Sequence, residues 1–467
     1  MRPTSILLAA LAAPLCLATV EAQQLTPTER ARVDSAVRIV LAGTGAPSAS
    51  IAIVRGGEIV YENAYGNGRI EPNVPATPAM RYSIGSVSKQ FTATAVLLLA
   101  EEGKLSLDDK VAKWHKGLTR AGDITLRQLL SMTSGYQDYW PQDYVYTAMQ
   151  SPTTMHEIAH RWAAKPLDFE PGTKWQYSNT NYVIAGDIVE KVSGKPFMDF
   201  LRERIFTPLH MTSVADYNAG PLGPNDAGAY LRNALGPLRQ APKEGKGWLF
   251  GAGQLAMTAH DLALWNISVM NRSLLKTESY KAQQTDMLLE NGLSTRYGLG
   301  VNVAAVNGRR RISHGGAVSG YTTTNEIYPD DRTAIVVFTN IYPGAAGANG
   351  QIAARIANII FEKANEASVA ARDQARRIYD GLANGTIDRS LFTADANAYF
   401  SAQVLADYAA SLGPLGEPTE FSAGGEALRG GMVIRGYTIR AGGKEMGLTT
   451  MTLPDGRIDQ YIISRAG

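Results

Sequence analysis

Strand-like segments lie on both sides of a long helical stretch, and this order constrains the possible folds of the chain. Apolar and β-branched runs bounded by turn signals predict strands at 49–54, 58–65, 310–313, 321–328 and 333–339. Gly56-Gly57 predicts a hairpin between the first two, and Pro329-Asp330-Asp331 predicts one between the last two. We therefore expect one mixed sheet built from both ends of this region, with a helical subdomain inserted between them.

Apolar residues at helical spacing fill the region around and between these strands. They predict helices at 26–41, 86–102, 126–132, 153–164, 181–192, 258–270 and 351–363. The helix at 86–102 is strongly apolar, so we expect it to be buried. The stretch 219–246 is rich in glycine, proline and asparagine, which predicts a long loop over the surface or the mouth of a site.

The pattern changes near residue 364. Helices are predicted at 364–382 and 396–411, and strands follow at 432–440, 446–452 and 457–463. These segments predict a self-contained α+β domain over 364–467, added to a main domain over 23–363. No motif indicates its role; its position suggests that it covers the site, limits substrate size or mediates assembly.

The N-terminal residues 1–22 are typical of a secretory signal peptide. Arg2 precedes an apolar run over 6–19, and Val20-Glu21-Ala22 fits a small-residue cleavage site. The alternative is a buried N-terminal helix. The single cysteine, Cys16, lies inside this segment, and bulky Leu15 before it disfavours a lipid anchor. We expect a periplasmic or secreted protein whose mature form has no thiol, disulfide or cysteine-bound metal.

Composition limits the classes of partner. The 467 residues carry a formal net charge of +2 and are 45% hydrophobic, ordinary values for a globular protein. This balance gives no reason to expect nucleic acid or an acidic membrane as a partner. The expected partner is a small-molecule or peptide substrate, and the oligomeric state is not predicted.

Ser86-Val87-Ser88-Lys89 opens the apolar helix at 86–102. Residues three apart lie on one helix face, so Ser86 and Lys89 are expected to point the same way. A serine hydroxyl becomes a good nucleophile when a neighbouring base takes its proton, and a partly desolvated lysine can be that base. The pattern alone is weak, because Ser273-Leu274-Leu275-Lys276 repeats it.

Two further motifs distinguish the first copy from the second. Glu170-Pro171-Gly172 begins a stretch that ends in Tyr177-Ser178-Asn179, and His314-Gly315-Gly316-Ala317 follows much later. Tyr-x-Asn by itself is also weak, because it occurs twice more at 61–63 and 65–67. Both motifs follow Ser86, and the order of the three together is what makes them informative.

With these motifs the chain resembles the penicillin-recognising serine hydrolases of the class C β-lactamase type. That group includes D-alanyl-D-alanine carboxypeptidases, D-aminopeptidases, esterases and β-lactamases. The resemblance covers about 26–363 and extends to the stretches 129–135, 251–262 and 297–300. Met132 stands where the family has histidine, and Gln254 also departs from the family pattern. The implied fold is α/β (α+β): an antiparallel sheet with a helical subdomain.

The resemblance also implies roles for individual residues. Ser86 would attack a carbonyl carbon and become acylated, while Lys89 and Tyr177 share the base and acid work in an unassigned order. A neighbouring ammonium would lower the pKa of Tyr177 for this task. The remaining roles are substrate binding by Asn179, His314, Gly315 and Gly316, and an oxyanion hole from the backbone N–H groups of Ser86 and Ala317. No metal or cofactor is implied.

His314 departs from the lysine usual in β-lactamases. An imidazole is only partly cationic near neutral pH, so it holds a carboxylate less firmly than a lysine would. We therefore expect any β-lactamase activity to be slow, and a fast turnover of nitrocefin would contradict this.

One rival motif points to a different chemistry. His156-Glu157-Ile158-Ala159-His160 matches the His-Glu-x-x-His pattern of zinc peptidases, with Glu190 as a conceivable third ligand. Met155, Ile158, Ala159 and Trp162 form the apolar face of this helix, which places both histidines toward solvent. No Gly-x-Ser-x-Gly elbow occurs, which disfavours an α/β-hydrolase.

The sequence therefore predicts a serine hydrolase that acts through an acyl-enzyme. The preferred substrate is a peptide or amide, and D-residues are included among the expected substrates. The alternatives are a carboxylic ester, a weak β-lactamase, and a penicillin-binding sensor that keeps its acyl group. Specificity is expected to lie in loops such as 219–246.

Overall fold

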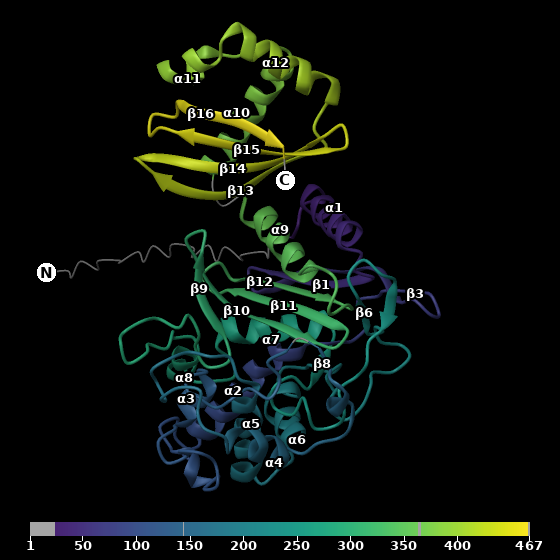
Figure 1. Cartoon of the computed structure of the whole chain (residues 1–467), viewed down its shortest axis with the longest axis vertical. Coiled ribbons are helices and arrows are strands. Elements are labelled where there is room, and N and C mark those ends of the chain that lie inside the picture. The colour runs from purple at the N-terminus through teal and green to yellow at the C-terminus, as the bar shows by residue number, and fades with distance from the viewer. Residues whose placement is uncertain (1–23, 143, 363–365, 466–467) are drawn as a thin grey trace, which may run out of the picture.

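The computed structural model describes residues 24–142, 144–362 and 366–465 (Figure 1). The predicted signal peptide over 1–22 lies outside the described residues. No helix within these ranges is long and apolar enough to cross a membrane.

In the part of the chain that the structure describes, the largest sheet has seven strands. Their spatial order is β3 (Val74–Pro75), β2 (Glu58–Arg69), β1 (Ser48–Arg55), β12 (Thr333–Thr339), β11 (Tyr321–Tyr328), β10 (Arg309–Val318) and β9 (Asn302–Val306). The N-terminal pair joins the C-terminal strands through β1 and β12, where Ile51 lies opposite Val337. The sheet is thus built from both ends, as predicted, but every neighbouring pair is antiparallel, so the expectation of a mixed sheet was wrong.

The sheet is covered on both faces (Figure 1). Helices α1 (Pro27–Thr44) and α9 (Ala348–Glu362) pack on one face, around Val37, Ile53 and Ile356. Helix α7 (Ala259–Asn271) packs on the other face, beside the helical region. Burial on both faces explains why the central strands β1 and β12 read as continuous apolar runs.

The helical region lies between β3 and β9 in the sequence. Its other helices are α2 (Lys89–Glu101), α3 (Leu126–Leu130), α4 (Met155–Ile158), α5 (Asn179–Ser193), α6 (Phe197–Leu201) and α8 (Thr277–Gln283). Short strands β4 (Tyr82–Ser83), β5 (Ala215–Asp216) and β8 (Leu255–Met257) form one small sheet, and β6 (Tyr230–Arg232) pairs with β7 (Leu238–Gln240). Helix α2 is buried from Lys89 to Leu99, as its apolar sequence predicts.

Two predicted helices differ from the structure, one at the Ser-x-x-Lys motif and one at the His-Glu-x-x-His motif. The helix expected at 86–102 begins as a 3-10 turn, Gly85–Ser88, and becomes α-helical only at Lys89. The helix expected at 153–164 is α-helical over Met155–Ile158 and continues as a π-helical turn, Ala159–Ala163.

The C-terminal residues form helices and a separate sheet with its own core. They comprise α10 (Glu366–Ala383), α11 (Ala394–Tyr399), α12 (Ala402–Leu412), β13 (Glu420–Arg429), β14 (Met432–Ala441), β15 (Lys444–Thr452) and β16 (Ile458–Arg465). The helix predicted at 396–411 is divided, because the Ser401 side chain caps α12 by accepting from the Val404 N–H. Strand β13 was missed, since Gly424, Gly425 and its charged residues are poor strand signals.

Candidate active site

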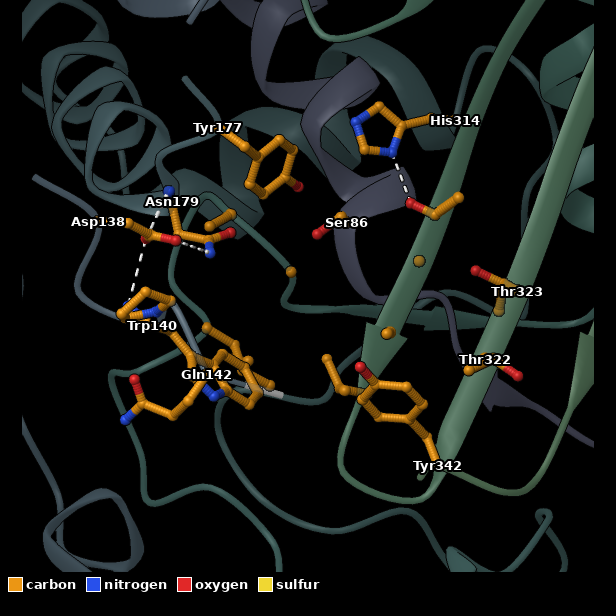
Figure 2. A pocket seen from close by; sticks show the side chains of 18 of the residues that line it. Ser86, Asp138, Trp140, Gln142, Tyr177, Asn179, His314, Thr322, Thr323 and Tyr342 are labelled. Atoms are coloured by element: carbon orange, nitrogen blue, oxygen red, sulfur yellow. Dashed lines mark hydrogen bonds between the residues drawn. The ribbon is translucent and has the colours of Figure 1, made fainter. Parts of the chain in front are cut away.

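Three segments that are distant in the sequence meet at one cavity. They are the 3-10 turn before α2, the start of α5 and the second half of β10 (Figure 2). The turn is fixed from both sides: the Ile84 N–H donates to the Leu255 carbonyl (3.0 Å), and the Thr323 hydroxyl donates to the Ile84 carbonyl (2.9 Å). Ser86 is partly exposed to the cavity, while Gly85 and Val87 beside it are buried.

Lys89 is fully buried beneath Ser86 and contacts three oxygen atoms. Its Nζ lies 2.9 Å from Ser86 Oγ, 2.8 Å from Asn179 Oδ1 and 2.8 Å from the Ala252 carbonyl oxygen. Burial lowers the pKa of the Lys89 ammonium to about 7, although the nearby Asp138 carboxyl acts in the opposite direction. Near neutral pH, a large fraction of this amine is therefore uncharged.

The three contacts define where the lone pair of the neutral amine points. Ala252 O and Asn179 Oδ1 can only accept hydrogen bonds, so the two N–H groups of the neutral amine go to them. Ser86 Oγ carries a hydrogen and can donate. The lone pair of Lys89 therefore faces the hydroxyl proton of Ser86, which is the arrangement that a general base needs.

Asp138 holds the Asn179 side chain in the orientation that this arrangement requires. Its Oδ1 accepts from the Asn179 N–H (2.8 Å), and its Oδ2 accepts from Asn179 Nδ2 (3.3 Å). Because a carboxylate can only accept, the amide NH2 faces Asp138 and the amide oxygen faces Lys89. Sequence reasoning missed Asp138. The signal available was its position, three residues after the recognised stretch 129–135.

Tyr177 lies above the Lys89 amine and faces Ser86. Lys89 Nζ is 4.9 Å from the centre of the tyrosine ring, and the phenol hydrogen-bonds with Ser86. Burial raises the pKa of Tyr177, and this outweighs the lowering effect of Ser86. The expectation that a neighbouring ammonium lowers this pKa was wrong, so the phenol stays protonated near neutral pH.

His314 also lies beside Tyr177, but it is neutral. Burial, and secondly the nearby Lys89 charge, lower the pKa of His314 to about 3. Its Nδ1 is 2.5 Å from the Gly315 carbonyl oxygen, which can only accept, so Nδ1 carries the hydrogen. Nε2 is then the acceptor from the Tyr297 hydroxyl at 3.0 Å. With both nitrogens engaged, His314 offers no cation to the cavity.

The second half of β10 has an unpaired edge. Strand β9 pairs with β10 only over Arg309–Ser313, whereas β11 pairs with it as far as Val318. The strand predicted at 310–313 is thus longer and includes the motif residues. Gly315 is exposed, so a substrate strand can approach its backbone.

Gly316 lines the cavity and also has a packing role. A Cβ atom there would lie 2.0 Å from the Ile84 carbonyl oxygen, so this glycine allows β10 to pack against the Ser86 turn. Gly85, with φ of +49°, is also constrained by packing: its Cβ would be 2.8 Å from the Ala317 nitrogen. These contacts bring the backbone of Ala317 next to that of Ser86, as a two-donor oxyanion hole requires.

The cavity above Ser86 has a volume of about 650 Å³. Its walls are mainly apolar and aromatic, and they include Tyr139, Trp140, Leu249 and Tyr342. Its lining contains no residue of 219–246 within the described chain; the loop that borders it is 138–142. Of the two positions predicted for 219–246, the surface or the mouth of the site, the lining therefore disfavours the mouth.

Met132 and Gln254, which depart from the family pattern, both make hydrogen bonds that support the site. Met132 Sδ accepts from the Ser178 N–H at 3.4 Å, next to Tyr177. Gln254 Oε1 accepts from the Gly251 N–H at 2.7 Å and so closes the turn that presents the Ala252 carbonyl to Lys89.

The rival motifs lie away from this cavity. Ser273 and Lys276 are exposed on the surface. His156 and His160 are exposed too, Glu157 accepts from the Thr154 N–H as a helix cap, and Glu190 accepts from the Phe197 N–H. Among the described residues, no three histidine, cysteine or acidic side chains are grouped so that they could hold a metal ion.

Comparison with known proteins places this geometry in a family. The family model named Beta-lactamase matches residues 33–358. Penicillin-binding protein 4* of Bacillus subtilis is 28% identical over 62% of this chain and 67% of its own length. The chain spans about two thirds of the length of such curated relatives.

Two solved structures are also similar. A D-stereospecific amidohydrolase from Streptomyces sp. is 26% identical, with a TM-score of 0.60, and the match covers 69% of this chain and 96% of that one. An octameric penicillin-binding protein homologue from Pyrococcus abyssi has a TM-score of 0.63 at 20% identity and covers 93% of this chain and 99% of its own, so its fold matches beyond the catalytic region. The chain belongs to the Beta-lactamase family and is a serine hydrolase of the β-lactamase and transpeptidase type.

Proposed function

We propose that this protein hydrolyses amide bonds next to D-amino acid residues, through an acyl-enzyme on Ser86. The observation that carries this proposal is the buried Lys89 amine, which contacts Ser86 Oγ and, when neutral, directs its lone pair at the Ser86 hydroxyl. A base whose pKa lies near the working pH is deprotonated in a large fraction of molecules and still accepts a proton readily.

In the proposed acylation, Ser86 Oγ attacks the substrate carbonyl carbon while its proton passes to Lys89. The N–H groups of Ser86 and Ala317 stabilise the negative charge on the carbonyl oxygen. The proton then moves to the leaving nitrogen, from Lys89 or through the Tyr177 hydroxyl, as the C–N bond breaks. Water next attacks the ester, loses a proton to the same base, and releases the acid and free Ser86.

Two observations support a D-amide as the substrate. The similar amidohydrolase from Streptomyces is D-stereospecific. In addition, His314 is neutral, and no lysine or arginine occurs among the described residues that line the cavity. A substrate carboxylate would find no cationic partner among these residues, which disfavours penicillins and C-terminal carboxylates.

Two further proposals concern the rest of the chain. The charged start, apolar run and cleavage pattern of 1–22 support export to the periplasm or the exterior. The separate core of the C-terminal sheet supports an accessory domain over 364–467. Truncation near residue 364 tests whether that domain affects kcat/KM or the oligomeric state. If neither changes, the domain has no role in catalysis or assembly.

A substrate panel tests the proposed function. Purified protein is assayed on D- and L-phenylalanine amide, a p-nitrophenyl ester and nitrocefin. The expected kcat/KM is at least tenfold higher for the D-amide than for the L-amide, with slow turnover of nitrocefin. Preference for the L-amide, or fast nitrocefin hydrolysis, would contradict the proposal.

The pH profile is predicted from the pKa of Lys89. Protonation removes the lone pair, so kcat/KM is expected to fall as the pH drops through about 7, and to level off above it. The neutral p-nitrophenyl ester is the substrate to use, because it does not itself titrate. The same fall in kcat/KM near pH 7 should remain in His314→Gln, because the pKa of His314 is about 3. A change in kcat/KM centred near pH 4 or near pH 10, in place of pH 7, would contradict Lys89 as the base.

A further inference from the structure

A second cavity lies between the C-terminal sheet and the helices α1 and α9, which cover the large sheet. Its volume is about 1350 Å³, against about 650 Å³ for the catalytic cavity, and none of its described lining residues lines both. One wall comes from α1, α9 and the turn between β9 and β10, and the other from α10, β13 and β14. Figure 1 shows β13 as the strand of the C-terminal sheet that lies nearest to α9. Clefts between two structural units are common places for binding sites.

The second cavity runs along an edge of β13. Successive side chains of a strand point to opposite faces, so a cavity that lies against one face meets every second residue. This is the case for β14, from which Thr438 and Arg440 line the cavity. From β13, the consecutive residues 419–424 line it without a gap. A cavity that meets consecutive residues passes the edge of the strand as well as a face.

That edge of β13 has no strand beside it in the part of the chain that the structure describes. β13 is the terminal strand of its sheet and pairs with β14 alone. Every second residue of a strand directs its backbone N–H and C=O groups to a given edge, so the outer edge presents donors and acceptors to the cavity. The pairing is regular over 420–423 and shifts at the bulge that contains Gly424 and Gly425. The stretch 420–423 is therefore the best template for a further strand.

The charged side chains of this lining favour an anionic partner. Five arginines and three glutamates line the cavity, and no lysine, histidine or aspartate occurs among its described lining residues. Arginine is thus in excess. Each glutamate also contacts an arginine already: Glu362 contacts Arg32, Glu420 contacts Arg355, and Glu426 contacts Arg435.

Arg32 on α1 and Arg355 on α9 are the arginines best placed to bind that partner. Among the described residues, each has one salt bridge, which it makes through Nη1. The other three lining arginines are also held by acids outside the lining, in the pairs Arg309–Asp331, Arg372–Asp373 and Arg440–Glu445. Because a guanidinium has five N–H donors, Arg32 and Arg355 keep donors for a further carboxylate.

We infer that this cleft binds an extended acidic peptide, which pairs with the outer edge of β13 and places carboxylates on Arg32 and Arg355. In strand addition the backbone hydrogen bonds supply affinity, and side chains of alternate residues supply specificity. Arg355 contacts Glu420 at 3.1 Å, so its guanidinium lies beside the strand that the peptide would join. The inference concerns a site apart from Ser86 and does not depend on the proposed function.

Peptide binding to the full-length Ser86→Ala variant tests this inference, because the variant avoids hydrolysis of the peptide at Ser86. The probe is a fluorescein-labelled peptide of alternating glutamate and valine, as long as β13, followed by fluorescence anisotropy. We expect saturable binding that is at least tenfold tighter than binding of the matched lysine–valine peptide. Equal binding of the two peptides, or no saturation at about 1 mM, overturns the inference.

Backbone methylation separates strand pairing from charge attraction alone. A glutamate–valine peptide that is N-methylated at every residue keeps its carboxylates but has no backbone N–H to donate. We expect this peptide to bind at least tenfold more weakly than the unmethylated one. Unchanged affinity would mean that β13 pairs with nothing, and it would overturn the inference.

Substitutions locate the bound peptide. Arg32→Gln and Arg355→Gln should each weaken binding at least threefold, since each removes a charged partner for a carboxylate. Arg202→Gln is the matched control: Arg202 is exposed in the helical region, pairs with Asp199, and lines neither cavity. Its affinity should equal that of the parent protein, and thermal unfolding checks that all three variants are folded. Wild-type affinity in both Arg32→Gln and Arg355→Gln, or an equal loss in Arg202→Gln, would place the peptide elsewhere and overturn the inference.

Discussion

Replacing Ser86 by alanine is expected to lower kcat/KM on the order of 10⁴-fold or more, because it removes the hydroxyl oxygen that forms the acyl-enzyme. Ser86 Oγ is a small part of the fold, so the variant should unfold at nearly the same temperature as wild type. The measurement is initial rates on the p-nitrophenyl ester and the D-amide, with thermal unfolding followed by circular dichroism.

The second Ser-x-x-Lys copy provides the matched control. Ser273→Ala removes the same atom from an exposed serine that lies away from the cavity. Its kcat/KM should remain within about twofold of wild type, since surface substitutions rarely perturb a structure. Similar losses in the two variants would show that the assay follows something other than chemistry at Ser86.

The second large effect is expected for Lys89→Arg, which keeps a positive charge but removes the base. A guanidinium stays protonated at any working pH, so it has no lone pair for the Ser86 proton. Its larger head must also fit where Nζ now contacts Ser86, Asn179 and Ala252 within 2.9 Å. Loss of a positioned general base costs about 10² to 10⁴ in rate, and we expect the upper end of that range.

Lys276→Arg is the control for this substitution, and it should leave kcat/KM unchanged. Lys89→Met separates the two causes of the loss, because it fits the site without a charge. Near-equal losses in Lys89→Arg and Lys89→Met would assign the effect to the missing base. Activity of Lys89→Arg within tenfold of wild type would instead point to Tyr177 as the base.

Much of the fold follows from local sequence patterns. The hairpins at Gly56-Gly57 and 329–331 are confirmed, and the long helices near Val37 and Leu97 occur where apolar spacing predicts them. These features depend on neighbours in the sequence, which a pattern can report. Strand β13 was not predictable in this way, because its partner β14, rather than its own composition, makes it a strand.

The chemistry of the site depended on long-range contacts that motifs do not contain. Spacing placed Ser86 and Lys89 on one face, but the low pKa of Lys89 results from its complete burial, which the helix pattern alone does not report. The neutral state of His314 likewise comes from burial and, secondly, from the nearby Lys89 charge. Asp138 lacked any motif, and its importance appears only when the start of α5 lies against it.

Trapping the acyl-enzyme tests the central claim most directly. Wild-type protein is mixed with the p-nitrophenyl ester of a D-amino acid, quenched in acid during turnover, and mapped by mass spectrometry after trypsin digestion. Cleavage after Arg81 and Lys89 yields the peptide 82–89, in which Ser83 and Ser88 serve as internal controls. We predict that the acyl mass increment lies on Ser86 and is absent in Ser86→Ala. An increment on another residue, or steady turnover by Ser86→Ala, would contradict the account.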